Sequence, residues 1–304
     1  MHYILSLFCA ICWVATSFAQ TTLDSIPFTV GADHRVYICC RVNNSDTLRF
    51  LFDTGATDMV LNVQSPRTKN IMKFDGTVNN LGTTGTGSVA RSSFNRLKIG
   101  KQELDSLAFL GIDYPPELWD GVIGLSFIRR YTIVLDYNRE NIYLYSPGTY
   151  FPPAEASTLP VNWTHGVPVI TLGLAIHGKS YVVRTEIDTG SDRVLDLSTP
   201  FVRNHQLLGT QQPFAVSHIS SSDGGSGELL NVWFDRLTIG NKHYNRIPGA
   251  FSTLTSGLLA GEAVDAMAGN NLLQRFNLAL DFSHNRISLW PNKRMELKYY
   301  DFLP

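Results

Sequence analysis

The residues best suited to chemistry are two aspartates that begin the same short motif at two places in the chain. Asp53 opens D-T-G-A, and Asp188 opens D-T-G-S. Mostly apolar segments flank Asp53 on both sides, LRFLF before it and MVLN a few residues after it, a pattern typical of buried strands. A carboxylate in such surroundings is strongly destabilised unless it has a partner or holds a proton. The sequence therefore requires one of these for Asp53.

The two motifs belong to an internal repeat that runs through most of the chain. Four segments recur in the same order: FLFDTGATDMVLN as TEIDTGSDRVLDL, FNRLKIGKQ as FDRLTIGNK, DGVIG as DAMAG, and TIVLDYNRENIYLY as NLALDFSHNRISLW. Segments that return in one order indicate a duplicated structural unit. The repeat predicts that Asp53 and Asp188 occupy equivalent places in two similar halves.

Strands dominate the pattern within each half. Residues 132–145 alternate around the turn signal YNREN, which predicts a hairpin, and the second copy turns at 283–285. The stretches 125–131 and 270–276 are long enough for about two helical turns each, so we expect one short helix per half. The fold class predicted is all-β with short helices.

The domain organisation follows from the segment between the halves and from the N-terminus. Residues 146–160 contain four prolines and one glycine, which break both periodicities. We predict an N-terminal lobe over 20–150 with the first D-T-G and a C-terminal lobe over 151–304 with the second. Residues 3–19 form an apolar run ending in a small-x-small pattern, which predicts a signal peptide over 1–19 that is cleaved on export to the periplasm or the extracellular space. A retained anchor helix is the alternative, although the run is short for the roughly 20 residues that span a bilayer.

Composition argues against several classes of function. The 304 residues carry 25 basic and 26 acidic side chains, a net charge of -1. There is therefore no excess of positive charge with which to bind nucleic acid or an anionic membrane. Beyond the predicted leader the cysteines are Cys39 and Cys40, and neighbours on a strand point to opposite faces, so we expect no bridge between them. No further Cys or His stands at ligand spacing near this pair, so we expect neither a metal nor a cofactor.

The chain resembles the aspartic peptidases in their duplicated, single-chain (pepsin-like) form, with local sequence closer to the retropepsin-like branch. The resemblance rests on D-T-G-A, D-T-G-S and two later elements in which glycine follows apolar residues, VIG at 122–124 and MAG at 267–269. It implies two β-barrel lobes of six to eight strands, related by a pseudo-twofold axis, with a substrate cleft between them.

The resemblance also implies a function, the hydrolysis of peptide bonds by an endopeptidase with Asp53 and Asp188 as catalytic residues. In this family two such carboxyls face each other, share one proton and hold the attacking water, so no covalent intermediate is needed. The burial of Asp53 would then be tolerated because it is half of a pair. The expected partner is a polypeptide substrate, cut by a monomer that is not inserted in a membrane once its signal is removed and that binds no nucleic acid.

The residues that follow each aspartate are expected to support the pair. By resemblance, the threonines would hydrogen-bond across the axis, and the glycines would let backbone N–H groups approach the carboxylates and permit unusual φ angles. Alanine stands in the first loop where serine stands in the second, so one aspartate is expected to lack a hydroxyl donor that lowers its pKa. We therefore predict a weakly acidic to neutral pH optimum. These loop residues are Thr54, Gly55, Ala56, Thr189, Gly190 and Ser191.

Two segments rich in glycine are expected to cover the site. By resemblance, NNLGTTGTGSV at 79–89 and SSSDGGSGELL at 220–230 are flap hairpins that close on substrate, and we assign substrate contacts to Gly85, Thr86 and Gly87. For the second segment, a surface turn is an equal alternative. Pepsin-like members carry a flap tyrosine that the first segment lacks, so its contacts must differ.

Two other functions compete with this hypothesis. A catalytically inactive protein could keep the two-lobed cleft to bind peptides, because a fold alone does not establish chemistry; such a protein has no need of both aspartates. A glycosidase also uses paired carboxyls but does not explain why both lie in one motif. We expect the remaining repeated acids to form turns (Asp136 and Asp281) or local hydrogen bonds (Asp120 and Asp265).

Overall fold

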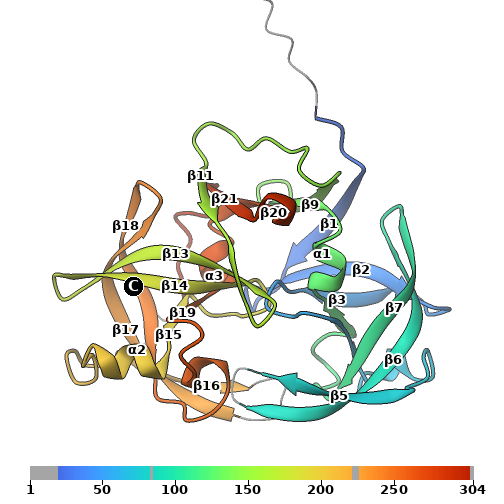
Figure 1. Cartoon of the computed structure of the whole chain (residues 1–304), viewed down its shortest axis with the longest axis horizontal. Coiled ribbons are helices and arrows are strands. Elements are labelled where there is room, and N and C mark those ends of the chain that lie inside the picture. The colour runs from blue at the N-terminus through green and yellow to red at the C-terminus, as the bar shows by residue number, and fades with distance from the viewer. Residues whose placement is uncertain (1–19, 83–84, 221–225, 302–304) are drawn as a thin grey trace, which may run out of the picture.

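The computed structural model describes residues 20–82, 85–220 and 226–301. The predicted signal peptide lies outside the described residues. Strands make up about half of the described residues and form two sheets, the smaller at the left of Figure 1 and the larger across its right side and top. Among the described residues, no helix is long and apolar enough to cross a membrane.

The first half of the chain supplies ten strands, a single-turn helix and a 3-10 turn. The order of strands in the larger sheet places β3 and β4 on either side of β8, a central arrangement that buries the segment leading into Asp53. The elements are β1 (Asp24–Val30), β2 (Val36–Val42), β3 (Leu48–Phe52), β4 (Met59–Asn62), η1 (Pro66–Thr68), β5 (Gly76–Leu81), β6 (Thr86–Ile99), β7 (Gln102–Ile112), β8 (Gly121–Ile123), α1 (Leu125–Ile128), β9 (Thr132–Asp136) and β10 (Asn141–Tyr145).

The second half repeats this sequence of elements. Its β14 and β15 flank β19, just as β3 and β4 flank β8, so the segment leading into Asp188 is central in the smaller sheet. The elements are β11 (Ser157–Pro160), β12 (Asn162–Thr164), β13 (Val167–Ile176), β14 (Lys179–Asp188), β15 (Leu195–Leu197), α2 (Thr199–Asn204), β16 (Ala215–Ser220), β17 (Ser226–Ile239), β18 (Lys242–Ser252), η2 (Leu258–Ala260), β19 (Ala266–Gly269), α3 (Asn270–Leu273), β20 (Phe276–Asp281), η3 (Phe282–His284) and β21 (Arg286–Pro291).

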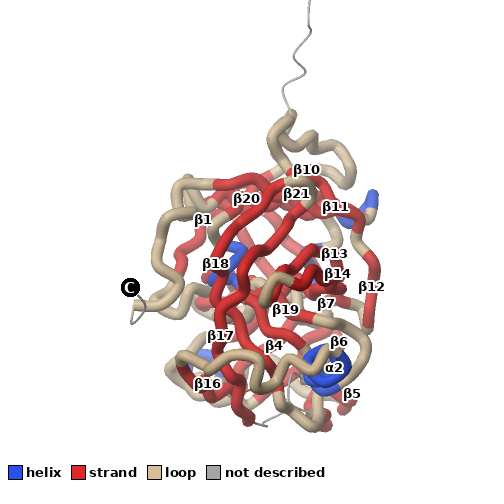
Figure 2. The backbone as a smooth tube through the Cα atoms, turned by 90° about the vertical axis from the view of Figure 1, so that its left-hand side faces the viewer, coloured by secondary structure: helices blue, strands red, loops and turns tan. Residues whose placement is uncertain are grey.

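The halves are joined through shared strand pairing. In the larger, 13-stranded sheet, β20 of the second half pairs with β9 of the first, and β11 and β21 extend the same sheet. These strands lie together at the top of the view in Figure 1, and Figure 2 shows the same layer above the two lobes from the side. The two predicted hairpins, β9–β10 and β20–β21, are thus confirmed, and they meet edge to edge.

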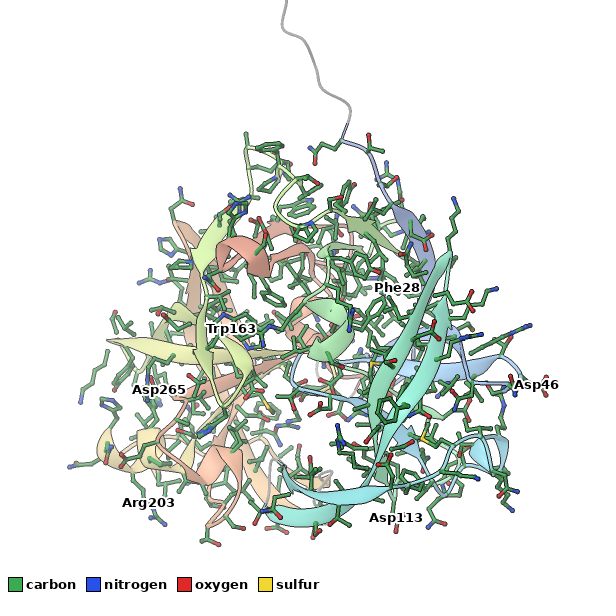
Figure 3. All side chains as sticks on the ribbon, turned by 45° about the vertical axis from the view of Figure 1, so that its right-hand side comes forward. Phe28, Asp46, Asp113, Trp163, Arg203 and Asp265 are labelled. Atoms are coloured by element: carbon green, nitrogen blue, oxygen red, sulfur yellow. The ribbon has the colours of Figure 1, made fainter. Side chains whose placement is uncertain are left out.

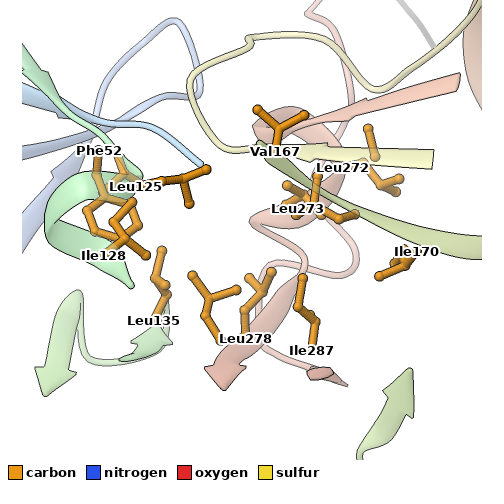
Figure 4. Close-up of a cluster of buried hydrophobic side chains, with 14 of the residues drawn as sticks. Phe52, Leu125, Ile128, Leu135, Val167, Ile170, Leu272, Leu273, Leu278 and Ile287 are labelled. Atoms are coloured by element: carbon orange, nitrogen blue, oxygen red, sulfur yellow. The ribbon is translucent and has the colours of Figure 1, made fainter. Parts of the chain in front are cut away.

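Apolar side chains from both halves merge into one core that includes the strands leading into the two D-T-G loops. Figure 4 shows this cluster, with Phe52 and Leu135 from the first half and Leu273 and Leu278 from the second. Phe52, which directly precedes Asp53, is fully buried. The core therefore fixes the position of the strand that carries the first aspartate.

The fold class predicted from the sequence is confirmed: the chain is all-β, with two lobes and few short helices. Both predicted helices begin where expected, at Leu125 and at Asn270, but they last only one turn each. The helix α2 was not predicted. Cys39 and Cys40 are both free, as expected from their adjacency. The boundary between residues 150 and 151 stays a prediction; no regular element covers residues 146–156.

Candidate active site

The two D-T-G loops meet between the lobes and are tied together by their threonines. Thr54 N donates to Thr189 Oγ1, and Thr189 N donates to Thr54 Oγ1, both at 3.1 Å. Each hydroxyl then donates to a carbonyl of the opposite strand, Thr54 to Ile187 O at 2.5 Å and Thr189 to Phe52 O at 2.9 Å. Both threonines are completely buried. These four bonds fix one loop against the other in a nearly symmetric way.

The carboxyl groups of Asp53 and Asp188 are hydrogen-bonded to each other across this junction. Strand β3 ends one residue before Asp53, whose N–H donates to the carbonyl of Ile123 on β8 at 3.0 Å. Each carboxyl also accepts two N–H bonds from its own loop. The donors are Gly55 at 2.7 Å and Ala56 at 3.0 Å for Asp53, and Gly190 at 2.8 Å and Ser191 at 3.1 Å for Asp188.

Each loop glycine lies directly against the carboxyl group of the opposite lobe. A Cβ atom on Gly55 would stand 2.8 Å from Asp188 Cγ, and one on Gly190 would stand 2.3 Å from Asp53 Cγ. Neither glycine has a positive φ, so the expected unusual backbone angle is wrong. The glycines are required by close approach, because any larger residue would enter the space of the aspartate pair.

Burial raises the pKa of both aspartates, and repulsion by negative charge raises that of Asp188 further. Desolvation is the largest cause at Asp53, and the N–H bonds from its loop oppose it. At Asp188 the pKa is raised well above its usual range, first by desolvation and then by the negative charges of Asp53 and Glu186. One carboxyl of the pair therefore ionises first and keeps its partner protonated.

The hydroxyl of Ser191 does not create the difference between the two aspartates. Ser191 Oγ accepts a hydrogen bond from Arg193 N at 3.2 Å, and it is not among the groups that shift the pKa of Asp188. The hydroxyl donor that the sequence led us to expect for one aspartate is therefore not found at Ser191. Desolvation, followed by the negative charges of Asp53 and Glu186, raises the pKa of Asp188 in the serine loop well above normal.

The two glycine elements and the helices after them hold the loops from behind. Leu125 N, at the start of α1, donates to Ala56 O at 2.8 Å, and Asn270 N, at the start of α3, donates to Ser191 O at 2.7 Å. A Cβ on Gly124 or Gly269 would approach a loop carbonyl to 2.1 or 2.4 Å. The elements VIG and MAG therefore serve to pack a helix N-terminus against each aspartate loop.

Arg35, which the sequence analysis missed, joins the first lobe to the second D-T-G loop. It lies between β1 and β2, and its Nε donates to Gly190 O at 2.7 Å. Its guanidinium also pairs with Asp33 at 3.2 Å and Asp192 at 3.5 Å, and it lowers the pKa of Asp53. The sequence signal was only a charged residue between two apolar strands, which gave no indication of a contact across the lobes.

The hairpin predicted as the first flap reaches the second lobe. It consists of β5 and β6, whose register pairs Asn80 with Gly87. At its tip, Gly82 N donates to Gly85 O at 2.9 Å, and Gly82 O accepts from Leu258 N of the second lobe at 3.3 Å. The predicted second flap is the hairpin of β16 and β17, and its tip at 221–225 lies outside the described residues.

The repeated acids outside the motifs make local contacts, as expected. Asp120 and Asp265 accept a backbone N–H from Arg49 and Arg184, respectively, each at 2.8 Å. Figure 3 shows Asp265 within the second lobe, far in that view from Asp46 and Asp113 of the first lobe. Asp136 and Asp281 bind side chains or N–H groups of the turns that follow them. Within the described parts of the chain, no three His, Cys, Asp or Glu side chains are arranged to hold a metal ion.

Comparison with known proteins agrees with this arrangement. Residues 38–127, which include the first D-T-G loop, match the family described as aspartyl protease. Among solved structures, the chain is similar to the aspartic proteinase from Irpex lacteus, with a TM-score of 0.60 and 13% sequence identity over 91% of this chain and 99% of that one. No curated protein matches the chain.

The two-lobed fold is thus the fold of the pepsin-like aspartic proteinases. Within that fold, residues 38–127 of the first lobe match the aspartyl protease family.

Replacing Arg35 by glutamine is expected to move the acidic limb of the pH–activity profile upward. Arg35 lowers the pKa of Asp53, so its removal raises that pKa and delays ionisation of the pair as pH increases; we expect roughly half a pH unit. The measurement is kcat/KM against pH on a peptide substrate. Arg96→Gln is the control, because Arg96 pairs with exposed acids of the first lobe. An acidic limb that coincides with that of the unaltered protein would contradict the assignment.

Proposed function

We propose that this chain is a secreted aspartic endopeptidase that hydrolyses peptide bonds with water activated by Asp53 and Asp188. One observation carries the proposal: two loops from opposite halves of the repeat bring their carboxyl groups into a hydrogen bond with each other. The threonine bonds between the loops hold this pair in place. The raised pKa of Asp188 keeps a proton available at the pair.

The reaction follows from a pair that holds one proton. The ionised carboxylate accepts a proton from a water molecule as the water oxygen attacks the peptide carbonyl carbon. The protonated carboxyl donates to the carbonyl oxygen and so stabilises the tetrahedral intermediate. When the C–N bond breaks, a proton passes to the leaving nitrogen, which departs as an amine and leaves a carboxylic acid on the other fragment. The pair returns to its starting state, and the enzyme forms no covalent bond to substrate.

The hairpin of β5 and β6 is the proposed cover of the site, with Gly85, Thr86 and Gly87 as the residues that contact substrate. Its hydrogen bond with Leu258 links the tip to the second lobe, and a hairpin held there would keep bulk water from the carboxyl pair. Glycines at this position leave the backbone free to bond an extended peptide.

The alternative, a peptide-binding protein without catalysis, is less well supported. A binding cleft gains nothing from two carboxyls whose pKa values are raised by burial, because both then destabilise the folded protein at neutral pH. Export is proposed on the sequence of residues 3–19 alone, with the periplasm or the extracellular space as destination. The proposed active species is a monomer, since both aspartates come from one chain.

The test is digestion of an unfolded protein substrate by the purified chain between pH 3 and 8 in water enriched in oxygen-18. We expect cleavage with a weakly acidic to neutral optimum, because burial raises the pKa of both aspartates, and one labelled oxygen in each new carboxyl terminus. Mass spectrometry of the fragments gives both results. An absence of cleavage over the whole range, together with measurable binding of the peptides, would instead establish the binding protein.

A further inference from the structure

A third carboxyl group, that of Glu186, is buried beside the aspartate pair. Glu186 lies on β14, two residues before Asp188, and side chains two apart on a strand point to the same face. Only 2% of the residue is exposed, and its Oε2 atom has no hydrogen-bond partner among the described residues. The side chain therefore points toward the face of the sheet that carries Asp188, with one of its two oxygens unbonded.

The repeat shows that the fold itself does not require a carboxyl at this position. The equivalent residue of the first lobe is Leu51, two residues before Asp53, which is equally buried and packs with Val60 and Val122. A leucine here contributes apolar burial, whereas an unpaired carboxyl is costly in the same surroundings. Glu186 thus opposes stability, a feature typical of residues with a functional role.

The surroundings of Glu186 leave its charge to act on the pair. Its register partners are Val169 on β13 and Met267 on β19, and neither is ionisable. The charged groups that interact with it are the two aspartates: Asp53 acts on Glu186, and Glu186 in turn acts on Asp188. Burial and the charge of Asp53 raise the pKa of Glu186 to about 8. Loss of the proton from Glu186 therefore places a second negative charge beside Asp188.

We propose that Glu186 is a positioning residue for the proton of the pair: its charge, placed on the strand face of Asp188, keeps that proton on Asp188 as the solution becomes alkaline. The inference rests on the proposed function, because retention of this proton preserves the active, singly protonated state. In acidic solution Glu186 is neutral and leaves the first ionisation of the pair unchanged. Glu186 therefore extends the active range on the alkaline side only.

The test compares the unaltered chain with Glu186→Gln and Glu186→Leu, the second of which copies the first lobe. In profiles of kcat/KM between pH 3 and 10, we expect the alkaline limb of both variants to move down by about one pH unit or more, with the acidic limb unmoved. Glu186→Asp, which keeps a carboxyl, is expected to restore much of the alkaline range. Glu103→Gln, at an exposed position of the first lobe, is the control. A purely structural role would lower activity equally at every pH and would overturn the proposal.

Two measurements without substrate separate this proposal from the proposed function. Carbon-13 titration of the aspartate carboxyls is expected to show a lower pKa for Asp188 in Glu186→Gln than in the unaltered chain, and identical values would overturn the proposal even if the enzyme is active.

Urea unfolding at several pH values tests whether Glu186 keeps its proton when the chain is folded. The pKa of Glu186 is about 8 in the folded chain and about 4.3 in the unfolded chain. Its contribution to the free energy of unfolding is therefore fully present below pH 4 and is lost as pH rises toward 8. The urea concentration at the midpoint of unfolding should therefore fall for the unaltered chain, relative to Glu186→Gln, over that pH interval. If no cleavage occurs but both results hold, the proposed function fails and the role of Glu186 in retaining the proton stands.

Discussion

Replacing either Asp53 or Asp188 by asparagine is expected to lower kcat by about a thousandfold or more, within the range that acid–base groups contribute. Asparagine has nearly the same shape as aspartate, and it can still accept the N–H bonds of the loop through its oxygen. It can neither take a proton from water nor give one to the substrate. The measurement is kcat on a peptide substrate for each variant and for Asp105→Asn, whose carboxyl is exposed and pairs with Arg96. Equal activity of all three variants would show that Asp53 and Asp188 are not the catalytic residues.

The same two variants are expected to stay folded, which separates loss of chemistry from loss of structure. The pKa of Asp188 is raised well above that of an unfolded aspartate, so the unaltered chain loses stability as pH rises from about 4 toward the folded value. The Asp188→Asn variant has no proton to lose there. Its free energy of unfolding at neutral pH should equal or exceed that of the unaltered chain, as measured by urea denaturation.

Replacing Gly190 by alanine is expected to have the second largest effect, a fall in kcat of about a hundredfold or more. The added methyl group would lie 2.3 Å from Asp53 Cγ, which is impossible without displacing the carboxyl or the loop. Gly55→Ala should be milder, because its methyl would stand 2.8 Å from Asp188 Cγ. The control is Gly76→Ala, where a methyl group meets nothing within 4 Å.

The order of these effects is the informative measurement. If the glycines are required by contact with the opposite carboxyl, activity should fall from Gly76→Ala through Gly55→Ala to Gly190→Ala, and the pH profile of Gly190→Ala should be distorted. Should all three alanine variants lose activity in proportion to their loss of stability, the glycines would matter for folding alone.

The repeat allowed much of the fold and the identity of the loops to be predicted from the sequence. Hairpins and short helices depend on neighbours along the chain, so β9–β10 and the start of α3 were found from local pattern. The D-T-G loops were found because the same motif occurs twice. Their contact through Thr54 and Thr189 joins residues 135 positions apart, and it was inferred only from resemblance.

Residues that act across the lobes were missed because no local pattern marks them. Arg35 reaches a carbonyl 155 positions away, and the Asn270 side chain binds Tyr137 at 2.6 Å and donates to His34 O at 2.5 Å, again across the lobes. Glu186 left one signal, which the alignment of the repeats made visible: an acid in the place where the first copy has Leu51. The effect of Ser191 was predicted wrongly, since the orientation of a hydroxyl depends on a neighbour, Arg193, rather than on residue type.

The pairing of β9 with β20 limits how a substrate can reach the carboxyls. Because this strand pair joins the lobes on one side, the lobes cannot separate there without breaking the main-chain hydrogen bonds between β9 and β20. On the other side a weaker obstacle remains, the contact of 3.3 Å between Gly82 and Leu258 at the tip of a hairpin. Entry by lifting that tip admits a single extended strand more readily than a folded domain. For the proposed peptidase we therefore expect cleavage of unfolded segments, loose termini and long loops rather than of folded domains.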